Sequence, residues 1–430
     1  MRQTTTFLRR RGRGFARRLG AVPAAACAVL LFGCTTQAHP PAPASPAAGA
    51  GDRAEEGGTA ARQDTGRSTP SPGPAAACVD RILSRMSPAQ KVGQLFMGGV
   101  HVAGGTDGSA QASLTVLRRH HVGSVILMGP TTAGMPAVRA VTDRADQLAL
   151  DVGAHRIAPL VSTDQEGGQV QPLRGPGFTD IPSALAQGDF SGPRLQRNAA
   201  VWAGELRRAG IRLDLAPVAD VVASDLGRAN GPIGRYDRQF GSTAEAVRGH
   251  DAAFVKGFRQ AGVLTTLKHF PGLGGVRGNT DTTVQVTDTT TDRASDGLTA
   301  FREGVTAGAR FVMISLATYT RIDPAHQAAF SSVVIQDMLR KELGFDGVVI
   351  SDDLGNAAAV KAIPPGRRAL AFLRAGGDLV LSVNSGHIPT MTSAVLAALG
   401  DEPALRAHVE QSVRRVLAAK QAAGLLRCGR

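Results

Sequence analysis

The chain has 430 residues, which exceeds the length of an average domain but suits a single α/β barrel. Seven arginines and no acidic residue fall in the first 33 residues, so leaving this segment out lowers the formal net charge from +13 to +6. One Trp, two Tyr and no basic run interleaved with aromatic residues argue against a nucleic-acid-binding protein.

The first 33 residues have the layout of a secretory signal peptide. The arginine-rich start is followed by the apolar stretch Leu19–Phe32, which is too short to span a membrane comfortably. It ends in Leu31-Phe32-Gly33-Cys34, which resembles a bacterial lipobox except that Phe32 is larger than the usual residue. We predict a lipoprotein signal peptide over 1–33 and acylation of Cys34, which would anchor the exported protein to the outer face of the cell membrane. An ordinary signal peptide cleaved nearby is the alternative.

The next segment, residues 34–77, is rich in Ala, Pro and Gly and has almost no large apolar side chains. Such a composition cannot bury enough apolar surface to offset the entropy lost on ordering the chain. The sequence therefore predicts a disordered tether over 34–77, followed by one folded domain over 78–430.

Within that domain, short apolar runs alternate with segments of helical spacing, such as 243–260, 296–307 and 332–343. Ser87-Pro88-Ala89-Gln90 is typical of a capping box with Pro at the first helical position. The predicted strands are Gln94–Gly98, Ser124–Met128, Leu160–Thr163, Arg212–Pro217, Val263–Lys268, Phe311–Ser315, Gly347–Ser351 and Asp378–Ser382. Eight buried strands alternating with helices indicate an α/β fold of the (β/α)8 TIM-barrel type. A doubly wound open sheet is the alternative, but no G-x-G-x-x-G follows an early strand.

Two cysteines, Cys78 and Cys428, stand at opposite ends of the predicted domain. A barrel closes on itself, so its first and last elements lie side by side, and an exported protein meets an oxidising environment. The sequence therefore predicts a disulfide between Cys78 and Cys428, with two unpaired thiols as the alternative.

Charged residues gather at the ends of four predicted strands, which is where the active face of such a barrel lies. They are Asp164 and Glu166 after the third strand, Asp220 and Arg238 after the fourth, Lys268 and His269 at the end of the fifth, and Asp352 and Asp353 after the seventh. One such residue often only caps a helix, but four clusters at the same end of different strands indicate a binding site.

The residue types suit sugar chemistry. Lys268 and Arg238 offer donors and Asp164 an acceptor for several hydroxyl groups, while the Asp352 carboxylate could attack an anomeric carbon. Retaining glycoside hydrolysis needs such a nucleophile and a general acid about 5 Å away. No Cys or His group has zinc-ligand spacing, and no G-x-S-x-G elbow occurs.

Several motifs resemble those of family 3 β-N-acetylglucosaminidases. They are Thr163–Gly168 (TDQEGG), Arg238–Gly241 (RQFG), Lys268–Gly272 (KHFPG), Ser351–Leu354 (SDDL) and, at the start of the domain, Met86–Met97 (MSPAQKVGQLFM). The resemblance implies a one-domain barrel that acts without metal or cofactor on N-acetylglucosaminides, especially peptidoglycan fragments. It also implies that Asp352 is the nucleophile and that Asp164, Arg238, Lys268 and His269 hold the sugar.

The loop after the fifth strand departs from the family pattern. Leu273 replaces one His, and Thr283 stands where the family has the His that acts as general acid/base. Leu316 replaces a further His, and Gln169 a frequent Arg. Thr cannot donate a proton near neutral pH, so the proton shuttle of the family is missing.

Three hypotheses follow. In the first, the protein is a hydrolase, and Asp281 protonates the leaving oxygen, or Asp288 or Asp292 enters in its place. In the second, it is a sugar-binding lipoprotein that kept the pocket and lost turnover. In the third, it is a structural cell-wall protein with an incidental barrel. Retention of Asp352 favours the first, and we expect a monomer whose partners are an amino-sugar glycoside and, through the lipid anchor, the membrane.

Overall fold

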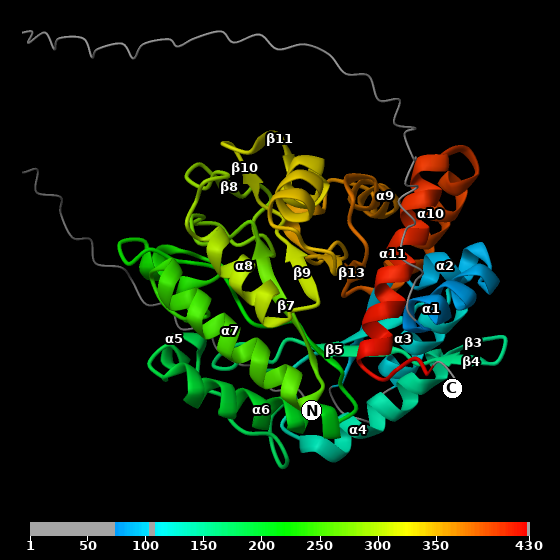
Figure 1. Ribbon diagram of the computed structural model, residues 1–430, viewed down its shortest axis with the longest axis horizontal. Coiled ribbons are helices and arrows are strands. Elements are labelled where there is room, and N and C mark those ends of the chain that lie inside the picture. Colours follow the sequence, from blue (N-terminus) through cyan, green and yellow to red (C-terminus); the bar gives the residue numbers. More distant parts are fainter. Residues whose placement is uncertain (1–73, 103–107, 428–430) are drawn as a thin grey trace, which may run out of the picture. The chain divides into compact units, whose positions relative to one another are not determined.

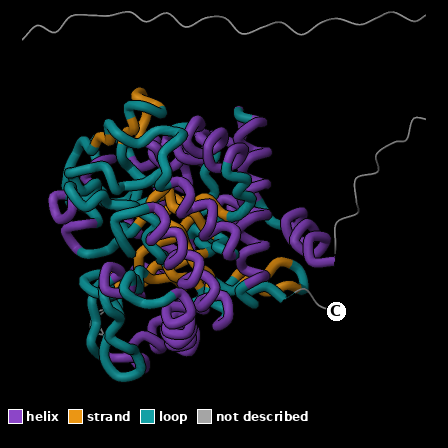
Figure 2. The backbone as a smooth tube through the Cα atoms, turned by 60° about the vertical axis from the view of Figure 1, so that its left-hand side comes forward, coloured by secondary structure: helices purple, strands orange, loops and turns teal. Residues whose placement is uncertain are grey.

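The computed structural model describes residues 74–102 and 108–427. Within them, eight parallel strands form a barrel surrounded by helices (Figure 1), and the strands lie at the centre of the domain in Figure 2 as well. The predicted signal peptide, Cys34, nearly all of the predicted tether, and Cys428 lie outside the described residues.

The barrel strands follow one another around the barrel in chain order. They are β1 (Phe96–His101), β2 (Ser124–Met128), β5 (Leu160–Thr163), β6 (Leu213–Asp214), β7 (Leu264–Phe270), β9 (Phe311–Ile314), β12 (Val348–Ser351) and β13 (Val380–Ser382). Every neighbouring pair is parallel. A bridge between Ile350 and Leu379 brings β12 beside β13 and closes the barrel. The prediction of a (β/α)8 barrel is therefore confirmed, and the open sheet is excluded.

Helices connect the strands and cover the outside of the barrel (Figure 1). The longer ones are α1 (Pro74–Arg85), α2 (Pro88–Gly93), α3 (Gly108–Arg119), α4 (Gly134–Ala145), α6 (Gly192–Arg208), α7 (Ala244–Ala261), α8 (Leu298–Ala307), η5 (Val333–Glu342), α9 (Pro365–Ala375), α10 (Ile388–Asp401) and α11 (Pro403–Ala422). No helix of the described part is both long and apolar enough to cross a bilayer.

Short elements fill the connections. They are α5 (Ala184–Gln187), the single-turn helices η1 (Asp146–Leu148), η2 (Gly227–Ala229), η3 (Gly234–Tyr236), η4 (Ala328–Phe330), η6 (Ala358–Val360) and η7 (Ser385–His387), the hairpin of β3 (Leu150–Val152) and β4 (His155–Ile157), and a small sheet of β8 (Thr287–Asp288), β10 (Thr318–Tyr319) and β11 (Asp323–Gln327). The sequence did not predict the hairpin or the small sheet, because strands this short carry little periodic signal.

Local sequence signals explain several helix ends. The Ser87 side chain accepts a hydrogen bond from the amide of Gln90, and the Gln90 side chain accepts one from the amide of Ser87, so the predicted capping box is confirmed. The Thr243 side chain caps α7 by accepting the amide of Ala246, and Gly262 ends the helix with a φ of 71°, a conformation that suits glycine.

Several predicted boundaries differ from the structure; the strand predicted at 212–217, for example, is reduced to β6 (Leu213–Asp214). The first helix begins at Pro74, so residues 74–77 belong to the folded domain and not to a disordered tether; Pro is tolerated in a first helical turn. The strand predicted at 94–98 begins at Phe96 and runs to His101. The helix predicted at 332–343 is the π-helix η5, and the amide of Leu343 bonds to the carbonyl of Met338.

Two apolar clusters support the barrel. One lies between the strands and the covering helices, and it includes Cys78, which is fully buried and disulfide-bonded. Because Cys428 lies outside the described residues, its pairing with Cys78 stays a prediction. The other cluster fills the barrel, where Val416 and Ala419 of α11 pack among inward-facing strand residues. Helix α11 thus closes the end of the barrel where the strands begin.

Lys420 on α11 is buried at this closed end, and its Nζ donates to Oε1 of Gln94 at 2.7 Å. Burial lowers the pKa of Lys420 from 10.5 to about 7. Above pH 7 the unfolded chain therefore binds a proton that the folded chain does not, and stability rises as the pH increases from 7 to 10.5.

We expect Lys420→Met to raise the free energy of unfolding at pH 7, because it removes the cost of burying an ammonium group. It should also flatten the increase in stability between pH 7 and pH 10. Urea unfolding at both pH values measures this, with Lys256→Met, a change on the exposed face of α7, as the control. A pH dependence identical to that of the wild type would contradict the prediction.

Candidate active site

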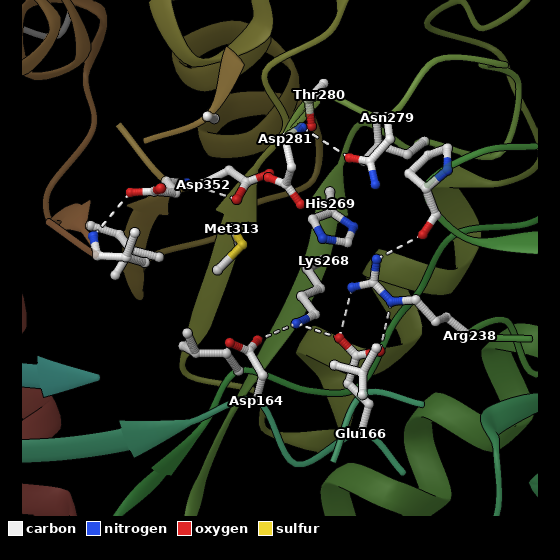
Figure 3. A pocket seen from close by; sticks show the side chains of 18 of the residues that line it. Asp164, Glu166, Arg238, Lys268, His269, Asn279, Thr280, Asp281, Met313 and Asp352 are labelled. Atoms are coloured by element: carbon white, nitrogen blue, oxygen red, sulfur yellow. Dashed lines mark hydrogen bonds and ion pairs between the residues drawn. The ribbon is translucent and has the colours of Figure 1, made fainter. Parts of the chain in front are cut away.

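A cavity of about 630 Å³ opens at the carboxyl ends of the barrel strands (Figure 3). Its polar lining includes Asp164, Glu166, Arg238, Lys268, His269, Asp281 and Asp352. All six residues predicted from the sequence to bind sugar or to catalyse lie here: the parallel strands point their carboxyl ends into one space. Apolar side chains such as Met313 and Leu381 complete the lining.

One side of the cavity is a cluster of four charges. The ammonium of Lys268 lies 2.6 Å from a carboxylate oxygen of Asp164 and 2.6 Å from one of Glu166. The guanidinium of Arg238 binds Glu166 in bidentate fashion, with Nη2 at 2.7 Å and Nε at 2.8 Å from its two oxygens. Two cations thus face two anions, which suits a rigid surface for sugar hydroxyls.

Glu166 is the centre of this cluster and was not assigned a role from the sequence. Its side chain is 3% exposed and joins both cations, whereas the Asp164 side chain is 32% exposed. Burial raises the pKa of Glu166, but the charges of Arg238 and Lys268 outweigh it and lower that pKa to about 2. The spacing Asp-x-Glu in the loop after β5 was the available signal, since alternate residues of an extended segment share one face.

His269 is held by a buried carboxylate behind it. Its Nδ1 lies 2.8 Å from Oδ2 of Asp220, while Oδ1 of Asp220 accepts hydrogen bonds from the amides of His269 and Leu273. Asp220 is fully buried and does not line the cavity. It orients the imidazole and leaves Nε2 for a ligand in the cavity.

Asp352 follows β12 directly, and its carboxylate lies on the side of the cavity opposite Arg238 (Figure 3). Burial raises the pKa of Asp352, the neighbouring His269 lowers it, and the charge of Asp281 raises it. The net result is a pKa of about 6. The adjacent Asp353 has a structural role, because its carboxylate accepts the amides of Gly355, Asn356 and Val383.

Asp281 reaches the cavity on the loop after β7. Its amide donates to Oδ1 of Asn279, and its carbonyl accepts the amide of Ala358 in η6 at 3.1 Å. Figure 3 shows its carboxyl group facing that of Asp352, with His269 beside them. Two carboxyl groups that face each other disfavour double ionisation, which is the arrangement that acid/base work requires.

The other acids considered from the sequence are not at the site. Asp288 is buried and accepts the amides of Thr290 and Thr291, and Asp292 accepts the amide of Ala294. Neither lines the cavity, so both are excluded as proton donors in this structure. Their side chains cap local turns, as short acidic side chains commonly do.

The residues that replace family histidines bring no titratable side chain to the cavity. Leu273 is buried and lines the cavity as an apolar group, and Leu316 is fully buried. Thr283 does not line the cavity; its methyl group lies near Gly278 within the loop. Gln169 does line it, in the place of a frequent Arg.

Comparison with known proteins agrees with this geometry. The sequence model of the glycosyl hydrolase family 3 N-terminal domain matches residues 89–419. The chain belongs to this family. A β-N-acetylhexosaminidase from Beutenbergia cavernae is 46% identical, with a TM-score of 0.75, and the match covers 78% of this chain and 99% of that one.

Two further relatives are matched over smaller shares of their own length. A family 3 β-N-acetylglucosaminidase from Paenibacillus sp. is 31% identical with a TM-score of 0.71, covering 79% of this chain and 63% of that one. A β-hexosaminidase of Stenotrophomonas maltophilia is 40% identical over 231 residues, and the match spans 66% of that relative and 52% of this chain.

Substituting the buried Glu166 tests the charge cluster. Glu166→Gln leaves the buried Lys268 and the partly buried Arg238 without their shared counter-ion, so we expect a loss of about 3–5 kcal/mol in the free energy of unfolding. Denaturant unfolding at pH 7 measures it. The control is Asp180→Asn, which breaks the exposed pair with Arg174 and should change little. Equal effects of the two substitutions would contradict the prediction.

Proposed function

We propose that the protein is a retaining glycosidase that hydrolyses β-N-acetylglucosaminides of cell-wall (peptidoglycan) fragments through a covalent glycosyl-Asp352 intermediate. One observation carries the proposal: the half-buried Asp352 carboxylate faces a second carboxyl group, Asp281, in a cavity whose other side is a charge-balanced polar cluster. The names of the Beutenbergia and Paenibacillus relatives support the acetamido-sugar class.

The first step is the transfer of the glycosyl group to the protein. Asp164, Arg238, Lys268 and His269 hold the hydroxyl groups of the nonreducing sugar. The Asp352 oxygen then forms a bond to the anomeric carbon while the bond to the leaving oxygen breaks, and that oxygen takes the proton of Asp281.

In the second step, Asp281 removes a proton from water, the water oxygen bonds to the anomeric carbon, and Asp352 leaves as a carboxylate. Asp281 ends the cycle protonated, so the step balances without a cofactor. In this scheme Asp281 does directly what the missing histidine of the family would do in partnership with it.

We further propose that the protein acts as an exported monomer, anchored through an acylated Cys34 to the outer face of the membrane. The support is the arginine-rich start, the short apolar stretch and the lipobox-like Leu31–Cys34. An anchored enzyme with a cavity for one amino sugar suits cell-wall fragments released at the cell surface.

A sugar-binding lipoprotein without turnover is the second candidate, because Thr283 is absent from the cavity lining and the single lining histidine among the described residues, His269, is tied to Asp220. Without general acid catalysis the rate would fall by about 10²–10⁴. Whether a bound substrate is cleaved at Asp352 distinguishes this function from hydrolysis.

Removing the nucleophile is the direct test. We expect wild type to release an aryl alcohol from an activated aryl N-acetylglucosaminide and to cleave a disaccharide of N-acetylglucosamine, and Asp352→Ala to do neither while still binding the sugar. Steady-state assays and calorimetric binding measure both properties. Saturable binding by wild type with no turnover of either substrate would establish the binding function and overturn the enzyme.

The pH dependence tests the pairing of the carboxyl groups. Asp352 must be ionised to attack, so kcat/KM for the activated substrate should fall as the pH drops below about 6. The activated substrate does not need the proton of Asp281, and a negative charge on Asp281 raises the pKa of Asp352, so with this substrate Asp281→Asn should move the acidic limb to lower pH. Asp288→Asn, outside the cavity, is the control. An unmoved limb in Asp281→Asn would show that the two groups do not interact.

A further inference from the structure

Asn230 is a fully buried amide that neither lines the cavity nor belongs to a motif singled out in the sequence. Its side chain makes five hydrogen bonds, all to the main chain. Three go to one loop and two to another, and both loops carry residues of the site. A single buried side chain that joins two such loops can set their relative position.

On one side, Asn230 organises the loop that carries Arg238. Its Oδ1 accepts the amides of Ile233 and Gly234, each at 2.9 Å. The carbonyl of Ile233 in turn accepts the amide of Arg238, and the carbonyl of Pro232 accepts Nη1 of the Arg238 guanidinium at 2.8 Å. The position of the sugar-binding arginine thus depends on the turn that the Asn230 oxygen holds.

On the other side, Asn230 holds the start of the loop that carries Asp281. Its Nδ2 donates to the carbonyls of Leu273, Gly274 and Val276, at 2.8, 3.1 and 2.8 Å. The amide of Leu273 also donates to Asp220, the residue that orients His269. From this fixed start the chain runs on to Asp281, whose own carbonyl bonds to Ala358.

Close packing around Asn230 leaves the two loops little freedom to shift. A Cβ atom on Gly274 would lie 1.8 Å from the carbonyl oxygen of Val221, and one on Gly231 would lie 2.4 Å from that of Arg277. A Cβ on Gly234 would lie 2.1 Å from the Gly227 oxygen and 3.3 Å from Asn230 itself. The glycines allow the main chains to come close enough for one amide to bridge them.

We propose that Asn230 is a positioning residue, which sets the Asp281 loop relative to the Arg238 loop so that the proton donor meets the leaving oxygen of a sugar held by Arg238. This inference rests on the proposed function. Only Asn suits the position, because the oxygen must accept two amides while the NH₂ group serves three carbonyls. A carboxylate of the same shape would face three carbonyl oxygens without a proton.

The test uses the full chain and a series of aryl N-acetylglucosaminides with good and poor leaving groups. A misplaced acid costs most where protonation is needed, so Asn230→Asp should lower kcat/KM by about 10²-fold for poor leaving groups. For the best leaving groups the loss should stay below about tenfold, because they need little protonation. Asn230→Ser, a milder change, should show the same trend if Asn230→Asp does not fold.

Two comparison variants make the result decisive. Asp281→Asn, which removes the donor, should show the same steepened dependence on the leaving group. Thr142→Val removes a buried hydrogen bond to the carbonyl of Ala209; neither residue lines the cavity, so this change should lower stability without altering how kcat/KM depends on the leaving group. Circular dichroism and thermal unfolding report the folded fraction of each variant.

The outcomes separate the two proposals. Suppose that Asp281→Asn makes kcat/KM depend more steeply on the leaving group, while both Asn230 variants lower kcat/KM by the same factor for every substrate. Then the inference about Asn230 is wrong and the proposed function stands. If Asp281→Asn leaves the dependence unchanged, Asp281 is not the donor and both proposals fail. Steepening in Asp281→Asn and in the Asn230 variants alike confirms the positioning role.

Discussion

A buried lysine and a partly buried arginine in the wall of one cavity require a carboxylate between them, and Glu166 supplies it. Removing charges from water costs several kcal/mol per ion, and only a close, fully hydrogen-bonded counter-ion offsets that cost. Glu166 binds Arg238 with both oxygens and Lys268 with one, and Asp164 completes the balance. The loops after β5 and β6 are thereby held to strand β7, and the rest of the site is built against them.

The opposite side of the cavity differs, because two carboxyl groups face each other there without a cationic side chain of the described residues bound between them. Asp352 and Asp281 face each other, and burial together with like charge keeps the pKa of Asp352 near 6. A balanced cluster holds a neutral sugar without changing its own ionisation, whereas an unbalanced pair can exchange a proton within the range where proteins work. In the proposed reaction, separate groups of the cavity would therefore bind the sugar and transfer the proton.

Sequence patterns predicted the elements whose formation depends on neighbouring residues, and they missed features that such patterns do not distinguish. The eight strands and the capping box at Ser87 follow from residue spacing and were predicted. The π-helix at Val333–Glu342 was not, because its periodicity differs little from that of an α-helix over so short a segment. The early start of α1 at Pro74 was missed because Ala and Pro dominate both the tether and the first helical turn.

The sequence by itself determined the barrel and the end of the barrel that carries the site, because the alternation of strands and helices places the carboxyl ends of all strands on one face. It also determined which residues meet there: Asp164, Arg238, Lys268, His269 and Asp352. Only the tertiary structure decided the parts that depend on contacts between distant segments. Glu166 meets Arg238 across 72 residues of chain, and Asn230 meets Leu273 across 43. It also turned Asp281 toward Asp352 and excluded Asp288 and Asp292, because loop direction is set by packing and hydrogen bonds that no local pattern records.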